Sequence, residues 1–123
     1  KKVGGKGFFY EPTILTTVNA GMPVFDEEVF GPVITITKFR TIEEAVDMAN
    51  LSKYGLGASI WTKDISKARN YIGSFETANV FINQPVRSDP RLPYGGTKRS
   101  GYGRELSYFG IKEFTNTKTV VIK

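Results

Sequence analysis

Alternating strand and helix patterns between residues 33 and 83 constrain the fold of this chain more than any other feature. The segment 33–39, Val-Ile-Thr-Ile-Thr-Lys-Phe, is β-branched almost throughout and predicts a strand. Apolar runs and helical spacings continue the series, so that strands and helices alternate over residues 33–39, 41–52, 58–62, 64–75 and 79–83. This order is typical of a parallel sheet whose strands are joined by crossover helices. The sequence therefore predicts an α/β fold.

Both predicted helices begin at a recognisable capping residue. Thr41, with Glu44 three positions later, forms a capping box, and Asp64 precedes the second helix. A short β-prone run over residues 13–18 lies upstream, and Pro12 suits the start of a strand there.

Residues 84–103 form the longest stretch without a regular pattern. They include three prolines and four glycines, at positions 85, 90, 93, 95, 96, 101 and 103. Loops of this length in a compact domain are usually functional. We expect a helix over 104–114 to follow, and then a short strand over 119–122.

The segment Asp26–Pro32 combines three acids, an apolar pair and a Gly-Pro break. We expect a helical turn with the acids at its N-terminus, where unpaired amides and the macrodipole favour negative charge. A carboxylate and an aromatic ring two to four positions apart can border one cleft, which suits a polyhydroxylated ring ligand. Taken alone, such a segment is more often an acidic first turn with a buried phenylalanine.

Composition limits the chemistry of the chain. Its 123 residues, 40% of them hydrophobic, suit one domain or one contiguous piece of a larger domain. Cysteine and histidine are both absent, so neither a thiolate nor a Ser-His nucleophile can be assembled from this chain alone. A metal site would rest on carboxylates, and no calcium-loop spacing occurs, so we predict none.

Charge and hydropathy bear on partners and location. The net charge of +5 permits an anionic partner, but 12 interspersed acids favour a solvated surface. No apolar run approaches membrane-spanning length and no apolar signal segment begins the chain, so we expect no membrane partner. The lack of cysteine fits a reducing compartment, and we expect a cytoplasmic protein.

Three motifs occur in a fixed order and spacing: Glu27–Pro32 (EEVFGP), Pro93–Gly96 (PYGG) and Lys98–Glu105 (KRSGYGRE). Together they resemble the C-terminal part of the NAD(P)-dependent aldehyde dehydrogenase superfamily, and residues 87–93 (Arg-Ser-Asp-Pro-Arg-Leu-Pro) resemble its succinate-semialdehyde dehydrogenase branch. A lead-in at 9–13 and a tail at 118–120 also match, so the resemblance covers essentially the whole chain.

The resemblance implies both an architecture and a reaction. Residues 1–115 would be the C-terminal part of the catalytic domain with an active-site loop at 84–103, and residues 116–123 would be a strand through which identical subunits associate. The reaction would oxidise an aldehyde, here succinate semialdehyde, to the carboxylic acid with NAD or NADP. The family's thiol nucleophile, oxyanion-hole asparagine and general base lie upstream in sequence, so this chain alone is expected to be an inactive fragment.

The resemblance also assigns roles to individual residues. Glu28 would hold the nicotinamide-ribose hydroxyls, and Phe30 would pack against the cofactor. Ser88 matches the position that faces the aldehyde tail. Tyr94 stands where most members have phenylalanine and would add a hydroxyl to the pocket. Glu105 resembles a glutamate proposed to pass protons toward the catalytic base.

Positive charge in the loop admits two interpretations. Arg87 and Arg91 would raise the local concentration of an anionic aldehyde at the mouth of a tunnel lined by Asn83 and the following loop. Basic residues interleaved with tyrosines are also what single-stranded nucleic acids need. The proline and glycine content favours a shaped loop, so we predict an aldehyde partner and no nucleic acid.

Ser88 and Glu105 also have simpler explanations. Ser88 is equally explained as a turn hydroxyl before a proline, and Glu105 as a first-turn acid that compensates a helix dipole. The whole chain is alternatively a non-catalytic binding or assembly module, or part of a dehydrogenase for a different aldehyde.

Overall fold

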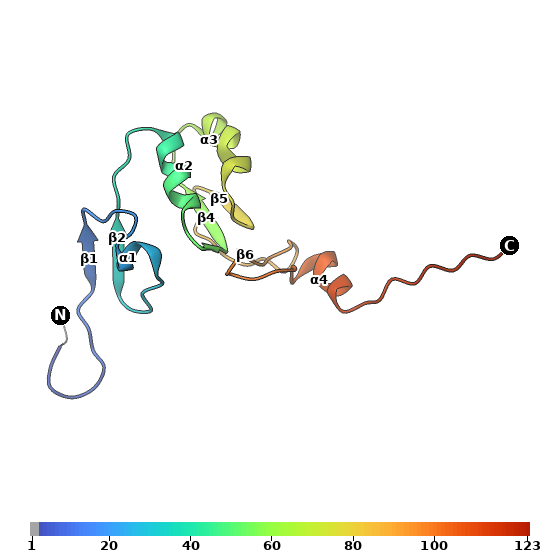
Figure 1. The fold of residues 1–123 in the computed structure, drawn as a ribbon, viewed down its shortest axis with the longest axis horizontal. Coiled ribbons are helices and arrows are strands. Elements are labelled where there is room, and N and C mark those ends of the chain that lie inside the picture. The colour runs from blue at the N-terminus through green and yellow to red at the C-terminus, as the bar shows by residue number, and fades with distance from the viewer. Residues whose placement is uncertain (1–2) are drawn as a thin grey trace. The chain divides into compact units, whose positions relative to one another are not determined.

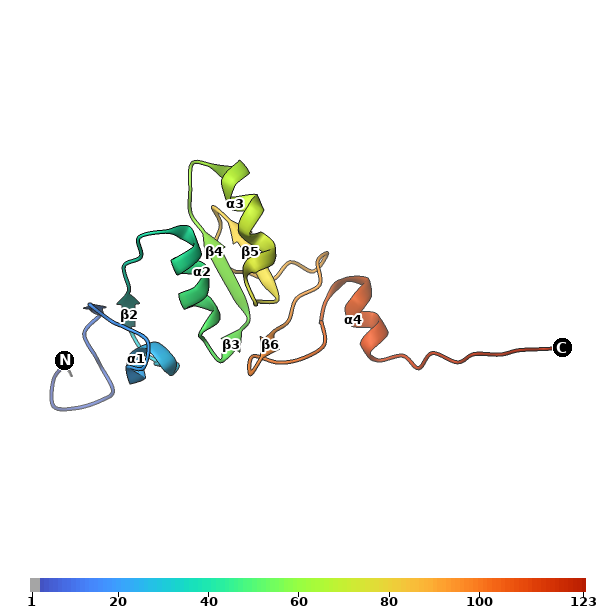
Figure 2. The ribbon, with the colours of Figure 1, turned by 45° about the horizontal axis from the view of Figure 1, so that its top comes forward.

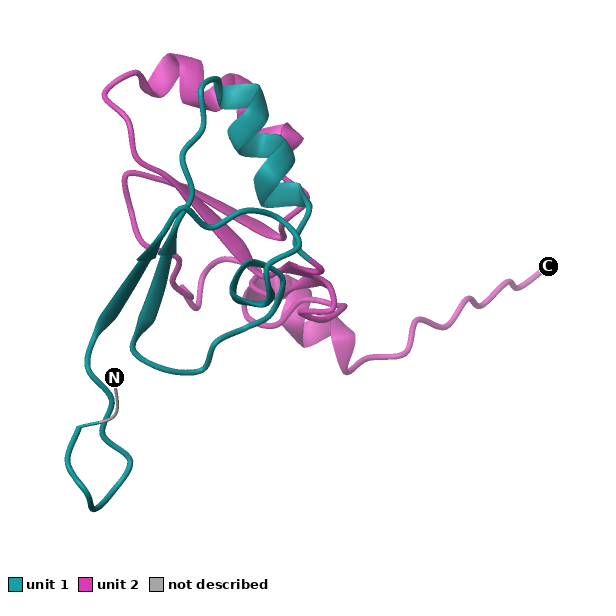
Figure 3. Ribbon diagram, turned by 60° about the vertical axis from the view of Figure 1, so that its left-hand side comes forward, with its two compact units in different colours: residues 1–52 teal, residues 53–123 magenta. Residues whose placement is uncertain are grey.

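The chain divides into two compact units, residues 1–52 and residues 53–123 (Figure 3). The structure is a computed structural model that describes residues 3–123. Strands and helices alternate along both units (Figure 1), and the predicted α/β class is confirmed.

The first unit is built on a two-stranded parallel sheet. Strand β1 pairs with β2 in a register that runs from Thr13 opposite Val33 to Thr16 opposite Ile36. A single-turn helix, α1, lies in the connection between these strands, and α2 follows β2. The bounds are Thr13–Thr16 for β1, Pro23–Asp26 for α1, Val33–Ile36 for β2 and Ile42–Asn50 for α2.

Of the three acids, only Asp26 lies in the first turn of α1, so the expectation that all three stand at a helix N-terminus is wrong. Helix α1 begins at Pro23 and ends at Asp26, and Glu27 is its C-cap. Proline suits the first turn because its φ is already helical and it has no N–H to leave unpaired. The helix therefore starts before the acids, and Glu28 lies beyond it in the loop that leads to β2.

The predicted strands pair in parallel, but they are divided between two pairs. Strand β2 pairs with β1, while the two later predicted strands pair with each other in the second unit. A β-branched pattern identifies a strand but does not name its neighbour, because hydrogen bonding uses backbone groups that all residues share.

Helix α2 begins at the capping box that the sequence predicts. The Thr41 hydroxyl accepts from the backbone N–H of Glu44 at 3.2 Å, and the Glu44 carboxylate accepts from the backbone N–H of Arg40 at 2.7 Å. Val46 is the buried side chain of this helix.

The second unit contains a parallel pair with its crossover and a small antiparallel pair. Strands β4 and β5 are parallel, with Gly57 opposite Asn79, and α3 forms the crossover between them (Figures 1 and 2). Strands β3 and β6 pair antiparallel, with Gly55 opposite Thr97. The bounds are Tyr54–Gly55 for β3, Gly57–Ile60 for β4, Ile65–Tyr71 for α3, Ile72–Ser74 for the 3₁₀ helix η1, Asn79–Ile82 for β5, Thr97–Lys98 for β6 and Ser107–Glu113 for α4.

Helix α4 starts later than predicted, at Ser107. Leu106 and Ser107 have φ values of 64° and 53°, in the left-handed region that interrupts a helix. Glu105 instead exchanges two backbone hydrogen bonds with Tyr94, at 2.8 and 2.9 Å. The interpretation of Glu105 as a first-turn acid is therefore wrong.

The segment after α4 is extended and exposed over 116–123 (Figure 2). No strand forms over 119–122 in the part of the chain that the structure describes. A strand requires a partner for its N–H and C=O groups, and none lies beside this segment within residues 3–123.

Each unit buries little apolar surface. Among residues 3–123, the buried apolar side chains are Val18 and Val46 in the first unit and Ile60 and Ala68 in the second. The face of the β1–β2 pair that carries Ile14 and Ile34 is uncovered, since these side chains remain 65% and 61% exposed. Parallel strands are normally covered on both faces, so local capping and side-chain hydrogen bonds matter in both units.

The Asp64 cap gives a direct test of this local stabilisation. Its carboxylate accepts from the Lys67 N–H at 2.8 Å at the start of α3. Asp64→Ala should lower the free energy of unfolding by about 1 kcal/mol, because one N–H of the first turn loses its acceptor. Asp64→Asn keeps the acceptor and should cost far less. Urea unfolding of both variants measures this, and equal losses would contradict it.

Candidate functional site

Side-chain hydrogen bonds hold the loop that contains most of the sequence-predicted site residues. The Thr97 hydroxyl lies 2.8 Å from the Glu76 carbonyl oxygen and 3.1 Å from that of Gly55. The Ser100 hydroxyl accepts from the Gly55 N–H at 3.0 Å. A Cβ on Gly55 would meet the Glu76 carbonyl at 2.9 Å, so this close approach requires glycine. The loop is thus attached to β3 despite its lack of regular structure.

Arg104, at the C-terminal end of the same loop, also forms hydrogen bonds that hold it. Its guanidinium donates to the carbonyl oxygens of Gly96 and Gly103, at 3.0 and 2.6 Å. The backbone N–H of Arg104 donates to the Glu113 carboxylate of α4 at 3.3 Å. Because the guanidinium bonds to carbonyls of its own loop, Arg104 acts here as a structural residue.

One cavity in the second unit, the larger of the two described here, has a volume of about 430 Å³. Its wall consists of residues 94–96 and 100–105, together with Leu56, Glu113 and Phe114. The sequence-predicted residues Tyr94 and Glu105 both line it, and they are joined through their backbones.

A smaller cavity of about 290 Å³ lies against β5. It is lined by residues 78–81 on one side and by Arg87, Asp89 and residues 92–94 of the loop on the other. The structure therefore brings together Arg87 and Tyr94, two of the residues that the sequence predicts to bind the substrate. Tyr94 lines both cavities.

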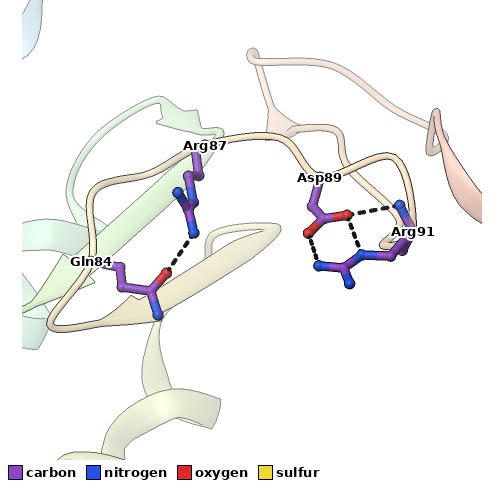
Figure 4. Close-up of polar contacts among 4 residues, drawn as sticks. All are labelled: Gln84, Arg87, Asp89 and Arg91. Carbon is purple, nitrogen blue, oxygen red and sulfur yellow. Dashed lines mark hydrogen bonds and ion pairs between the residues drawn. The ribbon is translucent and has the colours of Figure 1, made fainter.

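Asp89 and Arg91 form a bidentate ion pair within the loop (Figure 4). The Asp89 carboxylate accepts from the Arg91 side chain at 2.7 and 3.0 Å and from its backbone N–H at 2.9 Å. These hydrogen bonds hold the pKa of Asp89 well below its usual value, and they raise the pKa of Arg91. The Arg91 side chain is 86% exposed, and its charge is locally compensated.

Arg87 differs from Arg91 in its partner. Its guanidinium donates to the neutral side-chain oxygen of Gln84 at 3.3 Å (Figure 4). A neutral acceptor orients a cation without cancelling its charge. Of the two predicted arginines, Arg87 therefore presents the less compensated positive charge, and it does so at the wall of the smaller cavity.

Ser88 and Asn83 lie outside the walls of the two cavities. Ser88 is exposed and is not part of either cavity wall. The Asn83 amide donates to the Thr62 carbonyl and accepts from the Thr62 N–H, both at 2.8 Å. Asn83 thus extends the pairing of β4 and β5 by one step, and its φ of 54° turns the chain into the loop.

Glu28 and Phe30 both belong to the segment between α1 and β2 in the first unit. Both residues are exposed, Phe30 to 96%. Hydrogen bonds from Gly31 to Val29 at 2.9 Å and from Val33 to Gly31 at 2.8 Å make tight turns that shape this segment. The carboxylate and the ring are therefore both accessible to a ligand.

The described residues contain neither a metal-binding cluster nor a membrane-spanning helix. No group of three or more histidine, cysteine, aspartate or glutamate side chains within 3–123 is arranged to hold a metal ion. No helix over the same residues is long and apolar enough to cross a membrane.

Sequence reasoning missed Asn79 and Asp89 as residues of the smaller cavity. For Asn79 a signal existed, since an apolar strand bounded by two asparagines is unusual. For Asp89, the spacing from Arg91 matches a local ion pair, but its position on a cavity wall depends on contacts that are distant in sequence.

Comparison with known proteins gives a consistent family match. The model of the aldehyde dehydrogenase family matches residues 1–120. Succinate-semialdehyde dehydrogenase [NADP(+)] 1 of Mycobacterium bovis (strain BCG / Pasteur 1173P2) is 48% identical over 122 residues, which cover 99% of this chain and 27% of that protein. The chain thus spans about a quarter of the length of the curated relatives it matches.

Solved structures agree with the sequence match. A structure described as giving insights into cofactor and substrate selection by Gox0499 has a TM-score of 0.92 and 49% identity, over 100% of this chain and 27% of that one. An aldehyde dehydrogenase of Mycobacterium tuberculosis complexed with NAD+ has a TM-score of 0.89 and 40% identity, over 95% of this chain and 24% of that one.

The Asp89–Arg91 pair predicts a specific pH response. Because the folded-state pKa of Asp89 is lower than its unfolded value of about 3.9, the pair adds stability above that pH and loses it as pH falls through the folded-state pKa. Arg91→Ala should raise the pKa of Asp89, and Arg91→Lys should raise it less because the charge remains. An NMR titration of the Asp89 carboxyl carbon measures this. An unchanged pKa in Arg91→Ala would contradict the pairing.

Proposed function

Because the chain belongs to the aldehyde dehydrogenase family, we propose that it is the C-terminal portion of an enzyme that oxidises succinate semialdehyde with NAD(P)+. The observation that carries this proposal is the 48% identity over 122 residues to a protein named as succinate-semialdehyde dehydrogenase [NADP(+)]. The reaction consumes the aldehyde, water and the oxidised cofactor, and it yields the dicarboxylic acid, the reduced cofactor and a proton.

The cofactor is NAD or NADP, as in the relatives and structural neighbours. The residues in the loop before β2 fit its nicotinamide-ribose end. An exposed carboxylate at Glu28 has acceptor capacity for two ribose hydroxyls, and the uncovered ring of Phe30 offers an apolar wall. When bound, the cofactor supplies the hydride acceptor. The two residues orient it and limit where its ring can sit.

The loop in the second unit would bind the aldehyde. Arg87 supplies positive charge at the smaller cavity, where it would attract the carboxylate tail of the substrate. The hydroxyl of Tyr94 adds a polar group to a wall that also contains Phe81 and Leu92. Ser88 would donate to the same carboxylate, and Glu105 would pass protons at the edge of the larger cavity.

The thiol that attacks the aldehyde must come from outside this sequence, since these 123 residues contain no cysteine. The chain alone is therefore expected to be inactive. The exposed segment 116–123 would form the strand through which identical subunits associate, and its Val121 and Ile122 are 87% and 90% exposed. β-branched residues such as these suit addition to the sheet edge of another subunit. A cytoplasmic location stays a prediction.

Substrate discrimination tests the proposed function. The complete protein should oxidise succinate semialdehyde with a higher kcat/KM than butanal, which has four carbons and no charge, and the 123-residue chain should show no turnover. Arg87→Gln should raise the KM for succinate semialdehyde about fivefold, equivalent to about 1 kcal/mol, and should leave that for butanal unchanged. Arg69→Gln, the same change on α3, is the matched control.

Three results would count against the substrate proposal. Equal efficiency on the two aldehydes would favour a different aldehyde as substrate. Turnover by the isolated chain would contradict the requirement for an external thiol. Saturable RNA binding with a steep salt dependence, without turnover, would favour the binding-module alternative.

Neighbouring acids allow a sharp test of the cofactor site. Glu28→Gln should raise the KM for NAD(P)+ about tenfold, because a neutral acceptor replaces a charged one at the ribose, a change of about 1.4 kcal/mol. Glu27→Gln removes the same charge one residue earlier, at the C-cap of α1, and should have little effect. Initial-rate kinetics with varied cofactor measure both. Equal effects of the two substitutions would refute the specific role of Glu28.

A further inference from the structure

Tyr94 occupies a position that any movement of the loop would disturb. It lines both cavities described above, and its backbone exchanges hydrogen bonds with Glu105 at 2.8 and 2.9 Å. The next residue, Gly95, is held by a side chain of β5.

That side chain is Asn79, whose Nδ2 is 2.8 Å from the carbonyl oxygen of Gly95 and 2.7 Å from that of Leu56. A side-chain amide nitrogen carries two hydrogens, and here each has its own acceptor. Leu56 lies between β3 and β4, whereas Gly95 lies in the loop. One amide therefore ties the loop to the strands.

The loop has no side chain of its own at this point. A Cβ on Gly95 would meet the Gly103 carbonyl oxygen at 2.8 Å, so the backbone is packed too closely for any larger residue. The carbonyl of Gly95 accepts a hydrogen bond from the Asn79 side chain. Asn79 also contributes to the wall of the smaller cavity, next to Tyr94.

We propose that Asn79 is a positioning residue that holds the Gly95 carbonyl and so fixes Tyr94 between the two cavities. Its structural consequence is independent of the reaction. Its kinetic consequence rests on the proposed aldehyde oxidation, because Tyr94 lies in the loop assigned to the aldehyde. The side chain of the Asn79→Asp variant has the same shape but no donor when ionised, and it would face two carbonyl oxygens.

Hydrogen exchange in the complete protein measures the structural effect. Asn79→Asp should speed exchange of the Tyr94 and Glu105 amides about tenfold, because their backbone pairing loses the support of Gly95. The Asn83 amide, bonded to the Ile60 carbonyl at 2.8 Å in the β4–β5 pair, should exchange at an unchanged rate. Asn70→Asp on α3, an exposed site, is the matched control.

Kinetics measure the functional effect. Asn79→Asp should raise the KM for the aldehyde about tenfold and leave the KM for NAD(P)+ unchanged. Asn79→Gln, which keeps two donors, should restore part of the loss. If Asn79→Asp does not fold, Asn79→Ala, which adds no charge, replaces it in both measurements.

Several results would overturn this role. The first is that the Tyr94 and Glu105 amides exchange as slowly in the Asn79 variants as in Asn70→Asp. A second is equally faster hydrogen exchange of the Tyr94 and Asn83 amides. A third is a rise of the KM for the aldehyde together with that for NAD(P)+, and a fourth is failure of both the Asn79→Asp and Asn79→Ala variants to fold. Each of the last three would assign Asn79 a general structural role. If the wild-type protein does not oxidise succinate semialdehyde, the proposed function fails, whereas the exchange comparison still decides whether Asn79 positions Tyr94.

Discussion

Side-chain hydrogen bonds to backbone carbonyls are the interaction on which the loop of the second unit depends. Three prolines and four glycines prevent this segment from building a ladder of its own, because proline lacks an N–H and glycine has a high entropic cost of ordering. Asn79 and Arg104 donate to carbonyl oxygens of the loop, and Thr97 donates from the loop to the Glu76 carbonyl oxygen. The loop is consequently shaped by residues on the strands and at its own ends, and its Tyr94 lines two cavities.

In the loop before β2 in the first unit, the backbone is held by its own hydrogen bonds and the site side chains are left exposed. Tight turns shape the backbone around Gly31, but Glu28 and Phe30 are left exposed to solvent. The hydroxyls of a ligand can replace the water around an exposed carboxylate, and a flat ligand face can cover an exposed aromatic ring. This is the arrangement expected of a binding segment, and it explains why the family resemblance and the physical chemistry of these residues agree.

Local signals in the sequence predicted local structure well. The caps at Thr41 and Asp64 were correct because each depends on a hydroxyl or carboxylate three residues from its N–H partner. The strands β4 and β5 were correct because their apolar runs are short and well bounded. The early start of α1 at Pro23 was not predicted, because acids and a proline both suit a first helical turn and the acids lie three residues later.

Features that depend on distant contacts were not predictable in the same way. The pairing of β2 with β1, and of β6 with β3, depends on backbone groups that every residue carries. The late start of α4 follows from the pairing of Glu105 with Tyr94, eleven positions earlier. The smaller cavity unites Asn79 with Arg87 and Asp89, and only the folded loop brings them together.

We propose that Glu28 and Phe30 hold the nicotinamide end of the cofactor. A crystal structure of the complete protein with bound NAD(P)+ tests it most directly. We predict a Glu28 carboxylate oxygen about 2.6 Å from a nicotinamide-ribose hydroxyl, with the Phe30 ring packed against the cofactor. A Glu28 side chain that points into solvent, with the ribose held by other residues, would contradict it.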